Sequence, residues 1–238
     1  DSSIYIAECM NSLKEALSNC DKSKVVHLVI DGNSKDDTLS IIKNIIPNSI
    51  IVQQKPNGIY NAINYAVNNF VTTPYLTFLH SDDSYDKNYL NIMLGKLKNN
   101  SKNPSILVGS VEFIDAQSKK LYKRFPPFFS SFIQKYNNLI FHPNAIYPTE
   151  LEKRFPYDEK IGRSADHDHI NKLMLICNYK RIKSANYKFR ISNISTTYSG
   201  GIKNPIQHKL FSRIYIHFFE TNLLKRFFMK IRNRSYWS

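Results

Sequence analysis

The strongest constraint on the fold is the alternation of short apolar runs with amphipathic segments in the first part of the chain. Residues 25–30, 49–53 and 74–80 are apolar and rich in β-branched or aromatic side chains, a pattern typical of buried strands. Between them, residues 38–46 and 60–70 have the apolar spacing of helices. This alternation predicts βαβ units, and therefore an α/β fold with a mostly parallel sheet and helices on both faces.

The rest of the chain continues this pattern and then departs from it. We expect helices at residues 4–19, 89–97 and 168–176, and strands at 106–114, 139–147 and 187–192. After about Pro205 the strand pattern gives way to a basic, aromatic sequence. The chain is therefore expected to consist of a folded domain over residues 1–204 and a helical tail over residues 205–238.

Composition excludes several classes of protein. Hydrophobic residues make up 42% and charged residues 22%, the balance of a soluble globular protein and not of a disordered one. No apolar run approaches the roughly 20 residues of a membrane span, and no signal peptide is expected. The 3 cysteines are far apart, which argues against a disulfide scaffold and for a reducing compartment. The net charge of +14 favours an anionic partner, such as nucleic acid, phospholipid or a phosphorylated ligand.

Carboxylates follow two of the predicted strands. Asp31 ends the strand at 25–30, and Asp82 and Asp83 come directly after the strand at 74–80. Ligands of open α/β sheets bind at the carboxyl ends of strands, and carboxylates there suit Mg²⁺ or Mn²⁺ bound with a diphosphate. Taken alone, the Asp82-Asp83 pair is more simply explained as a capped turn before the next helix.

The Asp pair is accompanied by further motifs. Asp-Gly-Asn-Ser-Lys-Asp-Asp-Thr occupies 31–38, Lys-Pro-Asn-Gly-Ile-Tyr-Asn-Ala-Ile-Asn occupies 55–64, and His-Ser-Asp-Asp occupies 80–83. In this order the blocks resemble the family 2 glycosyltransferases, which have the GT-A fold. Weaker matches follow at 141–145, 157–159, 164–168 and 198–202, so the resemblance covers about residues 1–203. It implies a GT-A-like three-layer α/β/α sandwich.

The resemblance also implies roles for individual carboxylates. Asp82 and Asp83 would form the metal motif for Mn²⁺ or Mg²⁺, with Asp83 the direct ligand. Asp166 would be the catalytic base that takes a proton from the acceptor hydroxyl. The metal would stabilise the leaving diphosphate. By spacing alone, Asp166 is equally well explained as a first-turn acid of a helix.

Other positions are assigned to the substrates in the same way. The residues implied in nucleotide-sugar binding are Asp31, Lys55, Gly58, Asn61 and Asp82. Candidate contacts of the acceptor or the diphosphate are His142, Arg163 and Lys172. For Arg163 and Lys172, an ordinary solvated basic side chain is the competing explanation.

Three departures from the family pattern bear on these expectations. Asn61 stands where the family usually has Asp, and His142-Pro143-Asn144 replaces the usual His-Gln-Ala. The family's first strand is missing, because the sequence begins where that strand has already ended. We therefore expect this chain to be a fragment of a longer protein or to come from an incomplete gene model.

The tail over residues 207–238 is basic and amphipathic. Between Lys209 and Arg234 seven cations accompany one acid, Glu220. The apolar stripe comprises Leu210, Ile214, Phe218, Thr221, Leu224, Phe228 and Ile231. This pattern fits a helix lying on an anionic membrane surface, and it fits equally a helix packed on the folded domain.

Together these observations predict a metal-dependent, inverting glycosyltransferase. The donor would be a nucleotide-diphosphate sugar, most commonly a UDP-sugar, and the acceptor a hydroxyl of a lipid-linked or growing cell-surface glycan. The enzyme would be cytoplasmic, at the inner face of the cytoplasmic membrane. One alternative is a basic nucleic-acid-binding protein, although the acids at the strand ends oppose it and no nucleic acid is expected as a partner. Another is a catalytically degenerate glycosyltransferase-like binding domain, motivated by Asn61 and the missing strand.

Overall fold

The computed structural model describes residues 1–97, 105–126 and 140–192, which form two compact units. The first unit comprises residues 1–112 and 125–189, and the second begins with 113–124 and 190–192. The predicted tail, the boundary at residue 204 and the motif at 198–202 lie outside the described residues. Among the helices described, none has the combination of length and hydropathy that a membrane span requires.

The observed elements follow the predicted order closely in the first hundred residues. The α-helices are α1 (Ile6–Ser18), α2 (Thr38–Ile45), α3 (Ile59–Asn69), α4 (Tyr89–Leu97), α6 (Thr149–Arg154) and α7 (Ala165–Met174). The 3₁₀ turns are η1 (Lys22–Lys24), η2 (His142–Asn144) and η3 (Glu159–Ser164). The strands are β1 (Leu28–Asp31), β2 (Ile50–Gln53), β3 (Tyr75–Thr77), β4 (Ser84–Tyr85), β5 (Ser105–Ile114), β6 (Lys120–Arg124), β7 (Ala145–Pro148) and β8 (Asn178–Arg190).

Three predicted elements in the second half needed correction. The strand expected at 139–147 is largely replaced by η2, and only its end pairs as β7, because Pro143 lacks the N–H that a ladder needs. The helix expected from residue 168 begins at Ala165. The strand expected at 187–192 is the end of the much longer β8. The first half of β8 is rich in charged residues, so an apolar pattern does not identify it as a strand.

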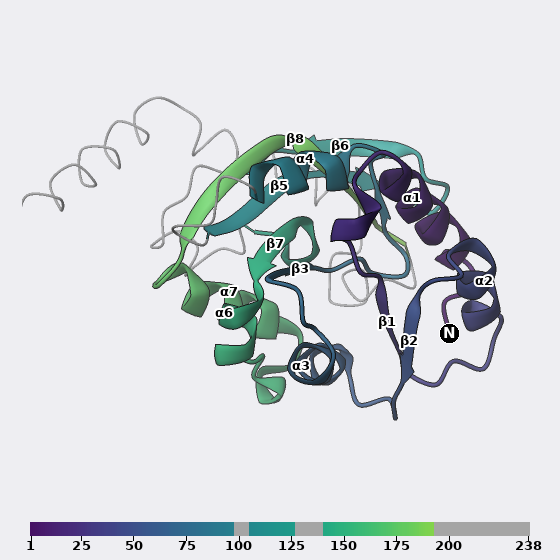
Figure 1. Ribbon diagram of the computed structural model, residues 1–238, viewed down its shortest axis with the longest axis horizontal. Helices are drawn as coiled ribbons and strands as arrows, with labels where there is room; N and C mark the ends of the chain where they lie inside the picture. The colour runs from purple at the N-terminus through teal and green to yellow at the C-terminus, as the bar shows by residue number, and fades with distance from the viewer. Residues whose placement is uncertain (98–104, 127–139, 193–238) are drawn as a thin grey trace, which may run out of the picture. The chain divides into compact units, whose positions relative to one another are not determined.

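The sheet is mixed, and not mostly parallel as predicted. β1 and β2 form a parallel pair, with Leu28 opposite Ile50, as the βαβ argument requires (Figure 1). The other strands form a second sheet of order β3-β7-β5-β8-β4, with β6 paired to β5, and its β3–β7, β5–β7 and β4–β8 pairs are antiparallel. Local periodicity identifies strands but not their distant partners, and β3 pairs with a strand from the second half of the chain.

Helices cover both faces of the strands in the first unit. On one face, α1 packs against α2, α4 and β4 and buries Ile6, Met10 and Leu13. On the other, Ile63 and Val67 of α3 pack with Tyr157 and Ala165 in a separate cluster. β3 contributes Tyr75 to the first cluster and Leu76 to the second, as alternate residues of a strand must. This arrangement confirms the three-layer α/β/α architecture.

The second unit has its own contacts. Phe113, at the end of β5, stacks on Tyr122 of β6 with ring centroids 4.4 Å apart. Arg190 is 1% exposed, and its Nη1 donates to the main-chain oxygen of Asp115 at 3.0 Å and to Ser118 Oγ at 2.9 Å. These bonds fix the turn that joins β5 to β6.

Candidate active site

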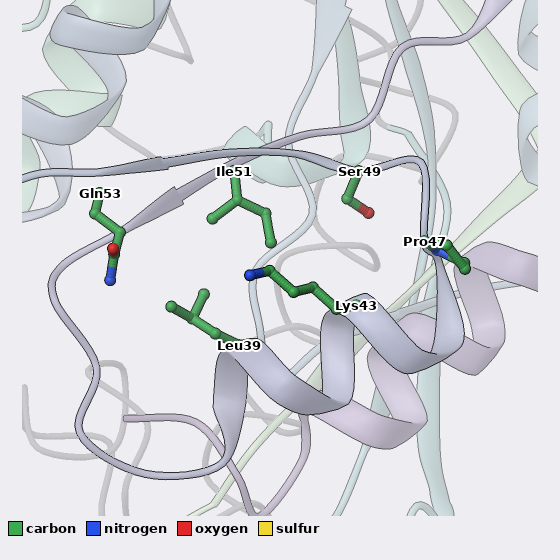
Figure 2. A pocket seen from close by; sticks show the side chains of 6 residues that line it. All are labelled: Leu39, Lys43, Pro47, Ser49, Ile51 and Gln53. Carbon is green, nitrogen blue, oxygen red and sulfur yellow. The ribbon is translucent and has the colours of Figure 1, made fainter.

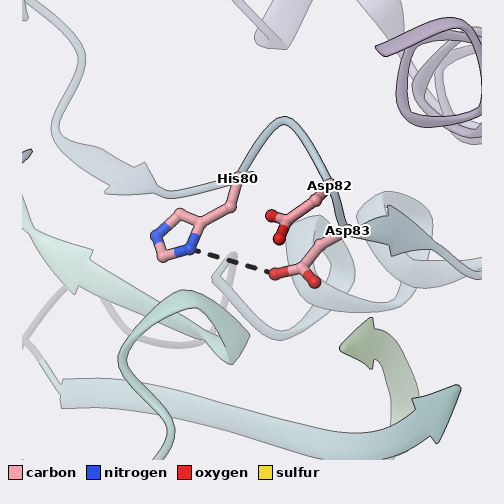
Figure 3. Close-up of side chains that lie close together, drawn as sticks. All are labelled: His80, Asp82 and Asp83. Carbon is pink, nitrogen blue, oxygen red and sulfur yellow. Dashed lines mark ion pairs between the residues drawn. The ribbon is translucent and has the colours of Figure 1, made fainter. Parts of the chain in front are cut away.

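The turn after β3 brings an imidazole and two carboxylates together. The ligand atoms of His80, Asp82 and Asp83 all lie within 4.8 Å of one another (Figure 3). Nδ1 of His80 is 3.9 Å from Oδ2 of Asp83, whose side chain is 1% exposed. The turn is closed by the Asp83 N–H, which donates to the His80 carbonyl at 3.1 Å. The predicted carboxylates therefore lie in the turn between β3 and β4, although β3 ends at Thr77 and not at His80 as predicted.

Tyr187 of β8 hydrogen-bonds to two residues of this turn. Its buried hydroxyl donates to Asp83 Oδ2 at 2.7 Å and accepts from the His80 N–H at 3.4 Å. Burial, and then the charge of Asp83, raise the pKa of Tyr187 well above its ordinary value, so the hydroxyl remains a donor. A carboxylate oriented by a fixed donor is the usual arrangement behind a metal ligand.

The chemistry of this cluster fits a divalent cation. Octahedral ligands about 2.1 Å from Mg²⁺ lie about 3.0 Å apart when adjacent and about 4.2 Å apart when opposite, and the 3.9 Å between the His80 and Asp83 atoms is close to the opposite separation. Burial lowers the pKa of His80, although the charges of Asp82 and Asp166 oppose the shift. The neutral imidazole so favoured has the lone pair that a metal binds. His80 stood in the motif at 80–83 but was not predicted as a ligand.

Asp166 approaches the same region from the first turn of α7. Its charge acts on both His80 and the hydroxyl of Tyr60, and the Tyr60 hydroxyl hydrogen-bonds to it. Burial raises the pKa of Asp166, although the His167 N–H donates to its Oδ1 at 2.7 Å and opposes the shift. Burial, followed by the charge of Asp166, raises the pKa of Tyr60 to about 12. A partly buried carboxylate with a raised pKa is suited to accept a proton.

A buried chain of hydrogen bonds lies beside these groups. His142 Nε2 is bonded to the Tyr157 hydroxyl, which donates to Glu152 Oε2 at 3.1 Å. Oε1 of Glu152 is 2.7 Å from Nε2 of His169. The His142 ring stacks on Phe78 at 4.4 Å and has its centroid 6.5 Å from that of His80. Glu152 and His169 were not among the predicted site residues.

Asp31, predicted to contact the nucleotide, stabilises the loop that follows β1. It is 5% exposed and accepts from Ser34 N at 3.0 Å, Ser34 Oγ at 2.6 Å and Gln53 Nε2 at 3.3 Å. Burial acts to raise the pKa of Asp31, but the bonds from Ser34 and Gln53 outweigh it and the pKa is lowered. The nucleotide contact stays a prediction.

The start of α3 carries three further predicted residues. Gly58 precedes the helix at φ 87°, a conformation that favours glycine, and Lys55 is exposed. The Asn61 side-chain amide donates to the Glu159 carboxylate, and its Nδ2 lies 3.2 Å from Oε1 and 3.1 Å from Oε2. An Asp at position 61 would place two carboxylates together. The substrate contacts of these residues stay predictions.

Two basic residues near α7, Arg163 and Lys172, were predicted as possible contacts of the acceptor or the diphosphate. Lys172 Nζ is paired with Asp168 Oδ2 at 2.7 Å on the helix surface, an arrangement that needs no ligand. Arg163 belongs to η3. Contacts of either residue with a diphosphate stay predictions.

A surface groove of 520 Å³ lies between α2 and β2, away from the motif turn (Figure 2). It is lined by Leu39, Lys43, Pro47, Ser49, Ile51 and Gln53. None of these residues was predicted to bind a substrate. Gln53, one of the lining residues, also donates to Asp31.

Comparison with solved structures supports the same architecture. S. aureus TarS 1–349 in complex with UDP has a TM-score of 0.63 at 20% identity, covering 80% of this chain and 58% of that one. Its complex with UDP-GlcNAc has a TM-score of 0.63 at 17% identity, covering 83% and 58%. Mannosyltransferase PcManGT from Pyrobaculum calidifontis, in complex with GDP-Man and Mn²⁺, has a TM-score of 0.55 at 14% identity, covering 91% and 67%. At these identities the likeness establishes the GT-A fold.

The sequence comparisons identify the family. Among curated proteins, none has a sequence that matches this chain. The family model described as Glycosyl transferase family 2 matches residues 3–158, which include the motifs at 31–38, 55–64 and 80–83. The chain therefore belongs to glycosyl transferase family 2 and has the GT-A fold.

Proposed function

We propose that this chain is a metal-dependent, inverting glycosyltransferase that uses a nucleotide-diphosphate sugar, with a UDP-sugar as the first candidate. The observation that carries the proposal is the cluster of His80, Asp82 and Asp83, with the charge of Asp166 acting on it. The TarS complexes contain UDP and UDP-GlcNAc, and the PcManGT complex contains GDP-Man and Mn²⁺, which supports this donor class.

In this proposal the residues after β3 serve the donor. Asp82, Asp83 and His80 would hold Mn²⁺ or Mg²⁺, with Tyr187 orienting Asp83. The bound cation supplies positive charge for the diphosphate as it leaves. Because the Asp83 side chain is 1% exposed, a charge there needs a cation or donors around it.

Asp166 serves the acceptor. Its carboxylate takes the proton from the acceptor hydroxyl while that oxygen attacks the anomeric carbon, and the bond from this carbon to the diphosphate breaks on the opposite face. The raised pKa of Asp166 makes it a stronger base than an exposed carboxylate. Tyr60 would orient Asp166, because its hydroxyl bonds to that carboxylate while its ring stacks on Tyr157 at 5.4 Å.

The acceptor and the location form the remaining part of the proposal. We infer a lipid-linked or growing cell-surface glycan as acceptor, and action at the inner face of the cytoplasmic membrane. The net charge of +14 supports an anionic surface as partner. The chain spans 58% of TarS 1–349, so the acceptor of the whole protein is part of the proposal.

The proposal is tested with two variants and a matched control. Asp83→Asn keeps an acceptor for Tyr187 but removes a charge, and it should abolish Mn²⁺-dependent binding of UDP measured by calorimetry. Asp166→Asn should leave that binding intact and stop turnover of UDP-GlcNAc or GDP-mannose to the free nucleotide. Asp86→Asn removes a charge from the next turn, between β4 and α4, and should change neither.

Full turnover by Asp166→Asn would refute the assignment of the base. Nucleotide-sugar binding by the wild type with no turnover of any donor would instead favour the catalytically degenerate binding domain.

A further inference from the structure

The buried chain of hydrogen bonds through Tyr157 determines which nitrogen of His142 carries a proton. Tyr157 has one hydroxyl proton, and it lies between a carboxylate oxygen of Glu152 and Nε2 of His142. Glu152 is 2% exposed, and Tyr157 and His169 are its only hydrogen-bond partners within the described residues. If Tyr157 donated to His142, the buried carboxylate would lose one of two donors, which is costly. The proton therefore goes to Glu152.

His142 must then be the donor in its bond with Tyr157. The His142 side chain is 4% exposed and its ring bonds to the uncharged Tyr157 hydroxyl, so burial favours the uncharged imidazole. The ring is therefore neutral and has a single N–H, at Nε2. Nδ1 is left with a lone pair and, within the described part of the chain, makes no hydrogen bond.

We infer what Nδ1 meets from the position of the ring. The His142 ring lies beside His80, which belongs to the cluster that would hold the metal and the diphosphate. The sugar of the donor is attached to that diphosphate, so its hydroxyls come next to the same cluster. A bare imidazole nitrogen accepts from a hydroxyl but cannot donate to a phosphate oxygen.

We propose that the Glu152–Tyr157 pair fixes His142 as the Nε2–H tautomer, so that Nδ1 accepts a hydrogen bond from a hydroxyl of the donor sugar. The identity of the ligand in this inference rests on the proposed function. The tautomer of His142 does not. The inferred contact differs from both roles first considered for His142, which were contacts with the acceptor or with the diphosphate, because the residue would contact the donor sugar. Glu152 and Tyr157 are positioning residues that act through His142.

The tautomer is measured directly by two-bond ¹H–¹⁵N correlation NMR on the full chain labelled with ¹⁵N-histidine. The 7 histidines are distinguished with His142→Gln, whose spectrum lacks the His142 signals. We expect a protonated Nε2 and a bare Nδ1 in the wild type. A protonated Nδ1 would overturn the inference, whatever the protein binds.

Glu152→Gln should move the His142 proton from Nε2 to Nδ1. Nδ1 of His169 is buried without a hydrogen-bond partner among the described residues, so a proton there would be an unsatisfied donor, and His169 should keep its proton on Nε2. The Gln oxygen then faces His169, and the Gln nitrogen donates to Tyr157. Tyr157 in turn donates to His142, whose proton moves to Nδ1. An unchanged His142 spectrum in a folded Glu152→Gln variant would contradict the proposed coupling.

Tyr147→Phe is the matched control for a lost buried hydroxyl near His142. Tyr147 donates to the main-chain oxygen of His142 at 3.0 Å and does not hydrogen-bond to its ring. The variant should leave the His142 tautomer unchanged. Tyr157→Phe removes the hydroxyl that bonds the ring and should disturb the tautomer, even if Glu152→Gln fails to fold.

The ligand is tested by comparing UDP with UDP-GlcNAc, and GDP with GDP-mannose, in calorimetric titrations with Mn²⁺. His142→Gln has an amide nitrogen that can replace Nε2 as donor to Tyr157 but has no equivalent of Nδ1. We expect about 5-fold weaker binding of the nucleotide sugar and unchanged binding of the nucleotide, as for one lost neutral hydrogen bond.

Equal losses for the nucleotide and the nucleotide sugar would assign His142 to the diphosphate and overturn the sugar contact. No binding of any nucleotide by the wild type would instead refute the proposed function, and the sugar contact with it. The tautomer would still be decided by the NMR experiment.

Discussion

Removing the Tyr187 hydroxyl should weaken both the fold and the binding of Mn²⁺. In Tyr187→Phe, the Asp83 carboxylate loses a donor at 2.7 Å while its side chain remains 1% exposed. A hydrogen bond to a charged group contributes about 2 kcal/mol, so we expect the free energy of unfolding to fall by about that amount in EDTA. Loss of an orienting group behind a metal ligand should also lower Mn²⁺ affinity by about 10-fold to 100-fold.

These two effects are separated by urea denaturation followed by circular dichroism, with and without Mn²⁺. At a Mn²⁺ concentration of 100 times the wild-type dissociation constant, binding should stabilise the wild type by about 2.7 kcal/mol. With affinity lowered 10-fold to 100-fold, the same concentration should stabilise Tyr187→Phe by only about 1.4 to 0.4 kcal/mol. Direct Mn²⁺ titration by electron paramagnetic resonance checks the affinities.

Tyr147→Phe is the matched control, because it also removes a buried tyrosine hydroxyl, one that donates to a main-chain oxygen. It should lose about 1 kcal/mol of unfolding free energy and retain the full stabilisation by Mn²⁺. Equal Mn²⁺ stabilisation of Tyr187→Phe and the wild type would refute the role given to Tyr187 behind Asp83.

Three further predictions follow from the same site. His80→Asn should reduce Mn²⁺ affinity more than Mg²⁺ affinity, because nitrogen ligands favour Mn²⁺; equal reductions in competition titrations would exclude His80 as a ligand. Since burial raises the pKa of Asp166, kcat/KM should fall on acidification through a pKa above the ordinary 3.8, and the ionised group should destabilise the fold. Asp166→Asn should therefore have a higher melting temperature than the wild type at pH 7. Below pH 3.8 the two melting temperatures should agree, because Asp166 is then protonated in both the folded and the unfolded wild type. Equal melting temperatures at pH 7 would contradict the raised pKa. Asn61→Asp should lower unfolding free energy by about 0.5 kcal/mol through repulsion from Glu159, an effect that high salt should remove in urea denaturation; a salt-independent loss would exclude repulsion as its cause.

The sequence predicted the parts of the fold that depend on neighbours along the chain. β1, α2 and β2 were found from local periodicity, and their parallel pairing follows from the crossover between them. The antiparallel pairing of β3 with β7 could not be predicted in this way, because nothing near Tyr75 specifies a partner such as Pro148. A mixed sheet therefore replaced the expected mostly parallel one.

In the candidate site, too, the residues found were those with a local sequence signal, and the residues missed were those that depend on distant partners. Asp82 and Asp83 were found because a strand end and a family motif coincide on consecutive residues. Tyr187 was missed, because its role depends on a contact with Asp83 across 104 positions of the chain. Glu152 and His169 were missed for a related reason, since a buried ion or hydrogen-bond partner has no local signature.

The most direct test of the proposed site is calorimetric titration of the full chain with UDP, in Mn²⁺ and in EDTA. If His80, Asp82 and Asp83 hold a cation that carries the diphosphate, UDP should bind with Mn²⁺ present and at least 10-fold more weakly in EDTA. Equal binding of UDP in the two buffers would contradict the metal-dependent account.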